Sequence, residues 1–252
     1  MTDLLCETPL LDYHHPTIDG LVGTRGWADL AVFERIGAAY DFVRDEVAFG
    51  YNRDDAIPAS RALADGYGQC NTKATLLMAL LRRLGVPCRL HGSTIRKALQ
   101  RGVVPEIAYR LAPEEILHSW VEVEWNGDWI NLEGVILDAP YLASLQTAFA
   151  GRGALCAYGV GTECLQHPGA DWTGTDTFIQ STGIQRDLGL WDDPDAFYMQ
   201  HRQDFGLVRG EIFRMIVRPL MNRRVAAIRR GRVPHIPGNA TDIASPAKDA
   251  AE

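Results

Sequence analysis

The sequence has few of the features that mark secreted or membrane-spanning proteins. Its five cysteines are an odd number at irregular spacings, which argues against a disulfide framework. No apolar run approaches the length that crosses a bilayer, and residues 1–11 carry acidic residues where a signal peptide carries basic ones. We therefore expect a cytoplasmic protein with reduced cysteines and no membrane partner.

Positive charge is also scarce. Lysine is almost absent, and the formal net charge is −7. Nucleic-acid-binding domains carry a basic footprint, so we expect no nucleic-acid partner. The arginines are dense between residues 202 and 232, where we expect them either to solvate a helix or to bind a carboxylate or phosphate.

Patterns of metal ligands are missing as well. Cys156, Cys164 and His167 do not have the spacing of a zinc site, and His14 and His15 have no third ligand at a suitable spacing. No acidic loop has the spacing of calcium ligands. We expect no metal and no cofactor.

The chain is otherwise that of an ordinary globular protein, with 46% hydrophobic and 23% charged residues. We interpret residues 1–27, which are rich in turn formers, as an irregular lead-in. Residues 28–138 are predicted to form the core, and residues 139–232 a mainly helical extension that packs on it. Residues 233–252 have the Pro, Gly, Ala and Ser content of a disordered tail.

The rest of the chain is organised around residues 65–87. Gly66 and Gly68 allow a tight turn before Cys70, and apolar residues at helical spacing follow until Gly85. Cys70 is thus expected in the first turn of a buried helix, where unpaired N–H groups and the helix dipole favour a thiolate. The alternative is that Cys70 is buried and acts only as a small hydrophobic residue, as free cysteines most often do.

A β-hairpin follows the helix. Residues 118–125 and 128–133 alternate between polar and apolar positions on either side of Asn126 and Gly127, the preferred pair for a type I′ turn. Trp125 then pairs with Asp128, Trp120 with Glu133 and His118 with Val135. One face is polar and the other is the core side, formed by Val121, Val123, Ile130 and Leu132.

The polar face brings His118 and Glu133 within reach of one another. A solvated sheet face is the alternative explanation, but Trp120 and Trp129 on the same face indicate that something covers or binds it. A cysteine at a helix start, a histidine opening a strand and a carboxylate on the returning strand supply a nucleophile, a general base and an orienting group.

These residues resemble the transglutaminase-like superfamily of papain-type fold, in a bacterial-type member. The resemblance rests on Gly68-Gln69-Cys70, on the phrase Leu84-Gly-Val-Pro-Cys-Arg89, and on His118-Ser-Trp-Val-Glu-Val123 followed by Trp129 and an acid. It covers about residues 30–138. It implies an α+β fold in which the nucleophile-bearing helix packs on an antiparallel sheet.

The resemblance also assigns roles. Cys70 corresponds to the nucleophile and His118 to the base, and Glu133 stands where the family usually has aspartate, with Asp138 as the alternative acid. The oxyanion hole is expected to use the Cys70 N–H, with Gln69 or Tyr51 as the second donor. Trp120 and Asn131 are further candidates for contact with substrate.

The implied activity is acyl transfer through a thioester on Cys70, with water or an amine as the acceptor. We expect a small-molecule or peptide substrate, and the sequence leaves the oligomeric state open. A non-catalytic binding or scaffold module is the alternative, supported by the departure of Glu133 from the usual aspartate and by the arginine-rich helix.

Overall fold

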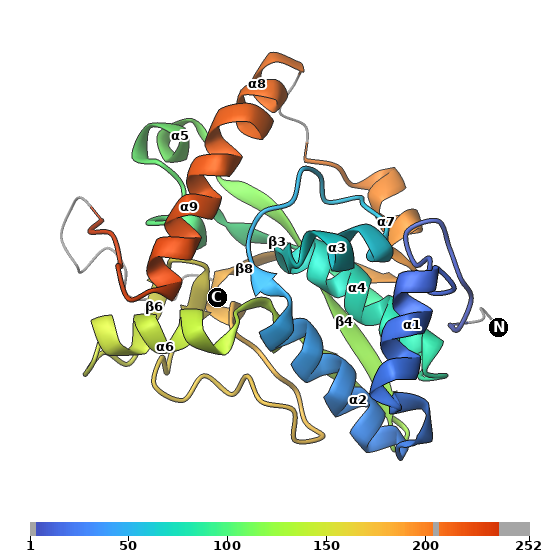
Figure 1. Ribbon diagram of the computed structural model, residues 1–252. Helices are drawn as coiled ribbons and strands as arrows, with labels where there is room; N and C mark the ends of the chain where they lie inside the picture. The colour runs from blue at the N-terminus through green and yellow to red at the C-terminus, as the bar shows by residue number, and fades with distance from the viewer. Residues whose placement is uncertain (1–3, 204–206, 237–252) are drawn as a thin grey trace, which may run out of the picture.

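A four-stranded antiparallel sheet lies at the centre of the computed structural model, which describes residues 4–203 and 207–236 (Figure 1). The strand order is β5-β4-β3-β8. The strands are β3 (Cys88–Arg96), β4 (Glu115–Trp125), β5 (Asp128–Leu132) and β8 (Ile184–Trp191). Asn126 and Gly127 both have positive φ angles, of 52° and 88°, as a type I′ turn requires. Trp125 pairs with Asp128, so the predicted hairpin register is confirmed.

The predicted pairing beyond Leu132 is wrong. The β4–β5 ladder ends at Val121 and Leu132, and Glu133 has helical angles (φ −84°, ψ −24°). The chain leaves β4 here because the Glu133 and Gly134 N–H groups donate to the Thr177 carbonyl, at 3.0 and 3.2 Å. Neither Trp120–Glu133 nor His118–Val135 is therefore a cross-strand pair.

Helix α4 (Cys70–Arg83) packs against β4 on one face of the sheet. It begins at Cys70 as predicted, and the chain turns away at Gly85, whose φ is 72°. Its burial is broader than the expected single stripe. Every residue from Asn71 to Arg82 is buried, because α2, α3 and the sheet surround the helix.

Two further helices of the core precede α4. They are α2 (Val32–Asp41), which continues into the π-helical turn η2 (Phe42–Glu46), and α3 (Ala59–Asp65). Between them lies β1 (Ala48–Phe49), which pairs in parallel with β2 (Tyr67–Gly68) immediately before α4.

The N-terminal lead-in is not irregular throughout. Residues 16–25 form helix α1 (Pro16–Arg25), and a 3-10 turn η1 (Trp27–Asp29) follows. Ile18 and Val22 are buried in the core cluster, which explains why this short segment is ordered as a helix. The turn formers that suggested a loop lie within the helix (Gly20 and Gly23) or at its ends (Pro16 and Gly26).

The connection between β3 and β4 contains η3 (Lys97–Gln100) and the short helix α5 (Glu106–Leu111). After β5 come η4 (Gly134–Ile136), α6 (Ala139–Ala148), the small hairpin of β6 (Leu155–Ala157) and β7 (Val160–Thr162), and η5 (Ser181–Gly183). The chain then returns to the central sheet as β8. The extension after residue 138 therefore contributes an edge strand to the core sheet as well as helices.

The last described helices follow β8. They are α7 (Pro194–Gln200) and the continuous segment α8 (Leu207–Ile212), η6 (Phe213–Val217) and α9 (Arg218–Arg229). The widened turn at η6 lies directly before Pro219, which has no N–H to donate to the preceding turn. α9 packs beside α6 (Figure 1). Of the predicted tail, residues 237–252 lie outside the described residues.

Candidate active site

Cys70 is the first residue of α4 and is partly exposed. Gly68 brings β2 close to the first helical turn, since a Cβ atom there would lie 2.7 Å from Thr72 Oγ1 and 2.9 Å from Lys73 Cγ. Within the described residues the Cys70 N–H makes no hydrogen bond. The thiol and a free N–H donor are thus presented together at the positive end of a helix.

His118 lies on β4, beside the start of α4, and is completely buried. Asn71 fixes this arrangement: its Nδ2 donates to the Leu117 carbonyl at 3.3 Å, and its Oδ1 accepts from Ser119 Oγ at 2.9 Å. The first turn of the helix is therefore bonded to both neighbours of His118 on the strand.

Glu133 lies behind His118 and is also completely buried. Its Oε1 is 3.3 Å from His118 Nε2. Its Oε2 accepts hydrogen bonds from the backbone N–H groups of Ile179 and Gln180, at 2.5 and 3.0 Å. Two backbone donors fix the position of this carboxylate and aim its other oxygen at the imidazole.

The two ring nitrogens of His118 have different surroundings. Nε2 lies at ion-pair distance from Glu133, whereas Nδ1 faces no carboxylate, and neither nitrogen meets the geometry of a hydrogen bond within the described residues. Burial disfavours the imidazolium, but the neighbouring Cys70 and Glu133 outweigh it and raise the pKa of His118 to about 10. Since Nε2 is turned to Glu133, Nδ1 is the nitrogen left for the thiol. This geometry favours a thiolate–imidazolium pair.

The backbone donors to Glu133 were not found from the sequence. They belong to residues 177–180, which lie in the extension and outside the segment that resembles a known family. A backbone N–H is common to every residue type except proline, so no side-chain pattern could have marked Ile179 or Gln180.

The polar sheet face is covered, as the tryptophans indicated. Trp120 is 6% exposed, its ring centroid lies 5.7 Å from that of His118, and its Nε1 donates to Asn131 Oδ1 at 2.7 Å. Asn131 in turn is bonded to Asp176. His91 stacks on the other side of Trp120 with the centroids 4.1 Å apart. Trp120 and Asn131 therefore shield the His118–Glu133 pair, and their polar groups already have protein partners.

The two candidates for the second oxyanion donor differ in their surroundings. Gln69 is tied to the neighbouring loop, because its Oε1 accepts from the Asn52 N–H and its Nε2 donates to Asp55 Oδ1, both at 2.8 Å. Tyr51 lies near Cys70, and burial together with that neighbour raises the pKa of Tyr51. A phenol that stays protonated can donate a hydrogen bond, so we retain Tyr51 as the candidate for the second donor.

Tyr51 is held by the C-terminal helix. Asn222 on α9 accepts from the Tyr51 N–H at 2.8 Å and donates to its carbonyl at 3.0 Å. Sequence reasoning missed this residue, since an asparagine in an arginine-rich helix carries no signal of its own.

Asp138, the alternative acid, lies elsewhere. It caps α6 by accepting from the Tyr141 N–H at 3.1 Å and forms an ion pair with Arg229 at 2.6 Å. Arg229 and the Phe49 N–H bond lower the pKa of Asp138 against the effect of burial. Its role is to join α6, α9 and β1, and the structure pairs Glu133 with His118 instead.

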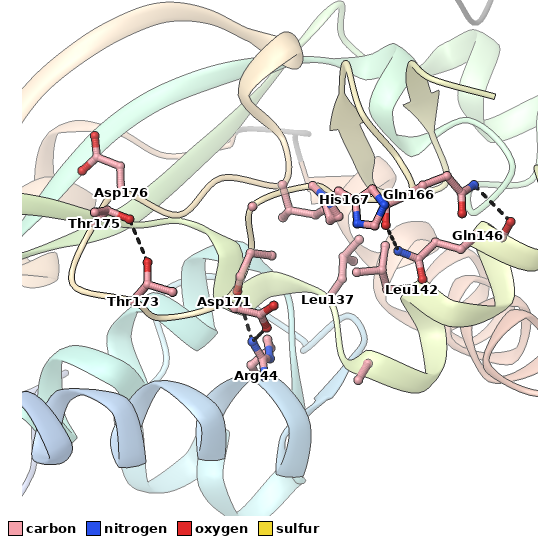
Figure 2. A pocket seen from close by; sticks show the side chains of 15 residues that line it. Arg44, Leu137, Leu142, Gln146, Gln166, His167, Asp171, Thr173, Thr175 and Asp176 are labelled. Carbon is pink, nitrogen blue, oxygen red and sulfur yellow. Dashed lines mark hydrogen bonds and ion pairs between the residues drawn. The ribbon is translucent and has the colours of Figure 1, made fainter. Parts of the chain in front are cut away.

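A cavity of about 490 Å³ opens behind this site, between α6 and residues 166–176 (Figure 2). Its lining includes Ile179, whose N–H donates to Glu133, but none of Cys70, His118 or Glu133. Arg44 lies at one side with Asp171, and Gln146 and Gln166 lie at the other (Figure 2). The cavity therefore lies behind the loop that supports the acid, away from the thiol.

Within the described residues, no group of three or more His, Cys, Asp or Glu side chains is placed to hold a metal ion. Over the same part of the chain, none of the helices combines the length and the apolar character that crossing a membrane requires.

Residues 24–134 match the family model of the transglutaminase-like superfamily. A solved structure of a candidate cysteine protease from Cytophaga hutchinsonii is 18% identical to this chain, with a TM-score of 0.38. The match covers 51% of this chain and 39% of that protein, which is less than half of its length. The curated proteins contain no match.

Proposed function

We propose that this chain, whose residues 24–134 belong to the transglutaminase-like superfamily, is a cysteine-dependent acyl-transfer enzyme. One observation carries the proposal: the buried His118 has Nε2 against Glu133 and Nδ1 open, beside a cysteine at the start of a helix. We assign Cys70 as the nucleophile, His118 as the acid and base, and Glu133 as the orienting group.

In the first half of the reaction the Cys70 thiolate attacks the carbonyl carbon of an amide or ester. The C–S bond forms, and the oxyanion is stabilised by the Cys70 N–H and the Tyr51 hydroxyl. The C–N or C–O bond then breaks, and His118 gives its proton to the departing amine or alcohol. The product is a thioester on Cys70 and a neutral His118.

In the second half an acceptor resolves the thioester. Water or an amine loses a proton to His118 as it attacks the thioester carbon, and the C–S bond breaks to restore the thiolate. Water yields a carboxylic acid, as in an amidase or peptidase, and an amine yields a new amide. We propose a small-molecule or peptide substrate for either course.

The alternative of a non-catalytic binding or scaffold module rested on glutamate in place of aspartate and on the arginine-rich helix. The longer side chain of Glu133 nevertheless brings a carboxylate oxygen to 3.3 Å from His118, and two backbone donors hold it there. This answers the first of the two observations, and the arginine-rich helix is compatible with either interpretation.

The proposal is tested by trapping the intermediate. The protein is incubated with a panel of activated acyl esters and peptide amides, the reaction is quenched in acid, and the intact protein is analysed by mass spectrometry. We expect an acyl adduct that maps to Cys70, is absent from Cys70→Ala and is released by hydroxylamine. Adducts that persist in Cys70→Ala, or that fall equally on the other four cysteines, would contradict the proposal.

A further inference from the structure

The helical segment formed by α8, η6 and α9 is strongly basic. Residues 207–232 contain eight arginines and one acidic residue, a formal charge of +7 in a chain whose net charge is −7. The rest of the chain therefore carries −14. Charge of one sign is concentrated on one element of an acidic protein, which indicates a surface for an anionic partner.

The inner half of this segment, which is α9, is part of the protein core. Met221, Val225 and Ile228 of α9 are buried in a cluster with Tyr141 and Leu145 of α6. Arg229 is fixed to Asp138. This half anchors the helix to the body of the molecule.

The outer half, which consists of α8 and η6, projects beyond the body of the molecule (Figure 1). Phe213 and Val217 pack against the hydrophobic cluster, but three other apolar side chains are uncovered: Ile212 is 48% exposed, Met215 73% and Ile216 56%. A soluble protein rarely leaves a row of large apolar side chains in water unless the row binds something.

Helix α5 adds apolar side chains at the same end of the molecule (Figure 1). Ile107 is 80% exposed and Leu111 73%. Ala108 and Tyr109 of the same helix pack on the cluster that holds Met221 and Val225. Both α5 and the outer half of the segment therefore leave apolar side chains uncovered.

Unpaired positive charge lies along the same helix. Arg223 and Arg230 are exposed, and neither makes an ion pair within the described part of the chain. Ile216 follows Ile212 by four residues, Arg223 follows Ile216 by seven and Arg230 follows Arg223 by seven, which is the spacing of one helical face. We call Ile212, Met215, Ile216, Leu220, Arg223 and Arg230 the outer face.

We propose that the outer face attaches the protein to the surface of an anionic lipid membrane. A helix that has an apolar stripe with arginines on the same side lies in the interface, with apolar side chains among the acyl chains and arginines at the lipid phosphates. The expectation of no membrane partner rested on the lack of a spanning segment, and attachment to a surface needs no such segment.

Two observations favour lipid over a protein occupant. The outer half is a projecting, convex element, whereas a partner helix needs a groove to enter. A second copy packed on this face would bring two strongly basic helices together, and like charges oppose that contact. A lipid surface accepts a projection of any shape and supplies the opposite charge.

The test is co-sedimentation of the full chain with vesicles. We expect binding to vesicles of phosphatidylcholine with phosphatidylglycerol, weaker binding to phosphatidylcholine alone, and loss of binding in high salt. The double variant Met215→Ser/Ile216→Ser should bind at least about tenfold more weakly, because two inserted side chains are lost. Met199→Ser is the matched control, since Met199 on α7 is even more exposed, at 81%, but lies on another element.

Three results would overturn the proposal. The first is no binding to the anionic vesicles, and the second is equal binding by the double variant and the wild type. The third is a dimer in sedimentation velocity that Ile216→Ser abolishes while vesicles do not bind, which would assign the face to a second copy. Binding by the Cys70→Ala protein should equal that of wild type, so the result does not depend on the proposed activity.

Discussion

Replacing Glu133 by glutamine should weaken the thiolate–imidazolium pair without removing the support of the loop. The glutamine oxygen can still accept from the Ile179 and Gln180 N–H groups, while the negative charge 3.3 Å from His118 Nε2 is lost. Two unit charges at that separation interact by at most about 5 kcal/mol at an effective dielectric constant of about 20. Cys70 contributes more than Glu133 to the raised pKa of His118, so removing the Glu133 charge should lower that pKa only in part.

The amide also changes the tautomer. Its NH₂ group is turned toward Nε2, which makes Nε2 an acceptor and places the proton on Nδ1, where the thiol needs a base. A comparable loss of orientation in catalytic triads lowers kcat by on the order of 10³ to 10⁴. We expect kcat/KM on any substrate found by trapping to fall by about 10³, which corresponds to about 4 kcal/mol of transition-state stabilisation.

The assay needs no substrate. The rate of alkylation of Cys70 by iodoacetamide is measured from about pH 5 to pH 10 by peptide mapping. In the wild type the imidazolium persists until the pH approaches the His118 pKa of about 10. In Glu133→Gln we expect that upper inflection to fall by at least about one pH unit, with a slower rate near neutrality.

Glu122→Gln is the matched control, because Glu122 lies on the same strand as His118 but pairs with His91 and Arg89. A Glu133→Gln profile that coincides with wild type would refute the role of Glu133. Equal shifts in both variants would show that the profile reports the charge of the sheet face and not this pair.

Further predictions follow from single contacts. Tyr51→Phe should lower kcat by about 10- to 100-fold and leave the alkylation rate of Cys70 unchanged, because the hydroxyl acts on the oxyanion alone; equal kcat values would exclude Tyr51 as a donor. Asn222→Ala should cost about 1–3 kcal/mol in urea unfolding, since it leaves both backbone groups of Tyr51 unpaired; an unchanged midpoint would show that water replaces the amide. Gly92→Ala should cost about 1–3 kcal/mol, as its Cβ would lie 2.3 Å from Phe197 Cε2; full stability would mean that α7 moves freely. Burial lowers the pKa of Lys73 to about 7 in the folded protein. Between about pH 7 and pH 10 Lys73 is therefore protonated in the unfolded chain but neutral in the folded one. The free energy of unfolding of the wild type should accordingly rise relative to that of Lys73→Met as the pH rises from about 7 to about 10. A parallel pair of stability curves would show that Lys73 remains charged.

The sequence was most informative where local chemistry determines the backbone. The turn preference of Asn126 and Gly127 set the hairpin register, and the glycines before Cys70 with the apolar residues after it set the helix start. They placed Cys70 at a helix start and His118 on a strand, whereas Glu133 lies beyond the end of the ladder and reaches His118 through its side chain. Transglutaminase-like motifs over the same residues agreed with that placement, and the family match over residues 24–134 confirmed the resemblance.

The remaining parts of the site depend on contacts between distant segments. Glu133 is oriented by backbone groups 46 and 47 residues later in the chain, and Tyr51 by an asparagine 171 residues later. Local patterns carry no signal for either. The same applies to α1, whose glycines suggested a loop but whose Ile18 and Val22 pack into the core and stabilise a helix.

The central claim is that Cys70 is a thiolate nucleophile activated by His118. It is tested most directly by treating the native protein with iodoacetamide at about pH 6 and mapping the label on all five cysteines. Cys6 and Cys164 are more exposed than Cys70, so access alone would favour them. We predict that Cys70 reacts at least about tenfold faster than either, and that His118→Ala abolishes the difference. If Cys70 reacts no faster than the exposed cysteines, or if His118→Ala leaves its rate unchanged, the claim is contradicted.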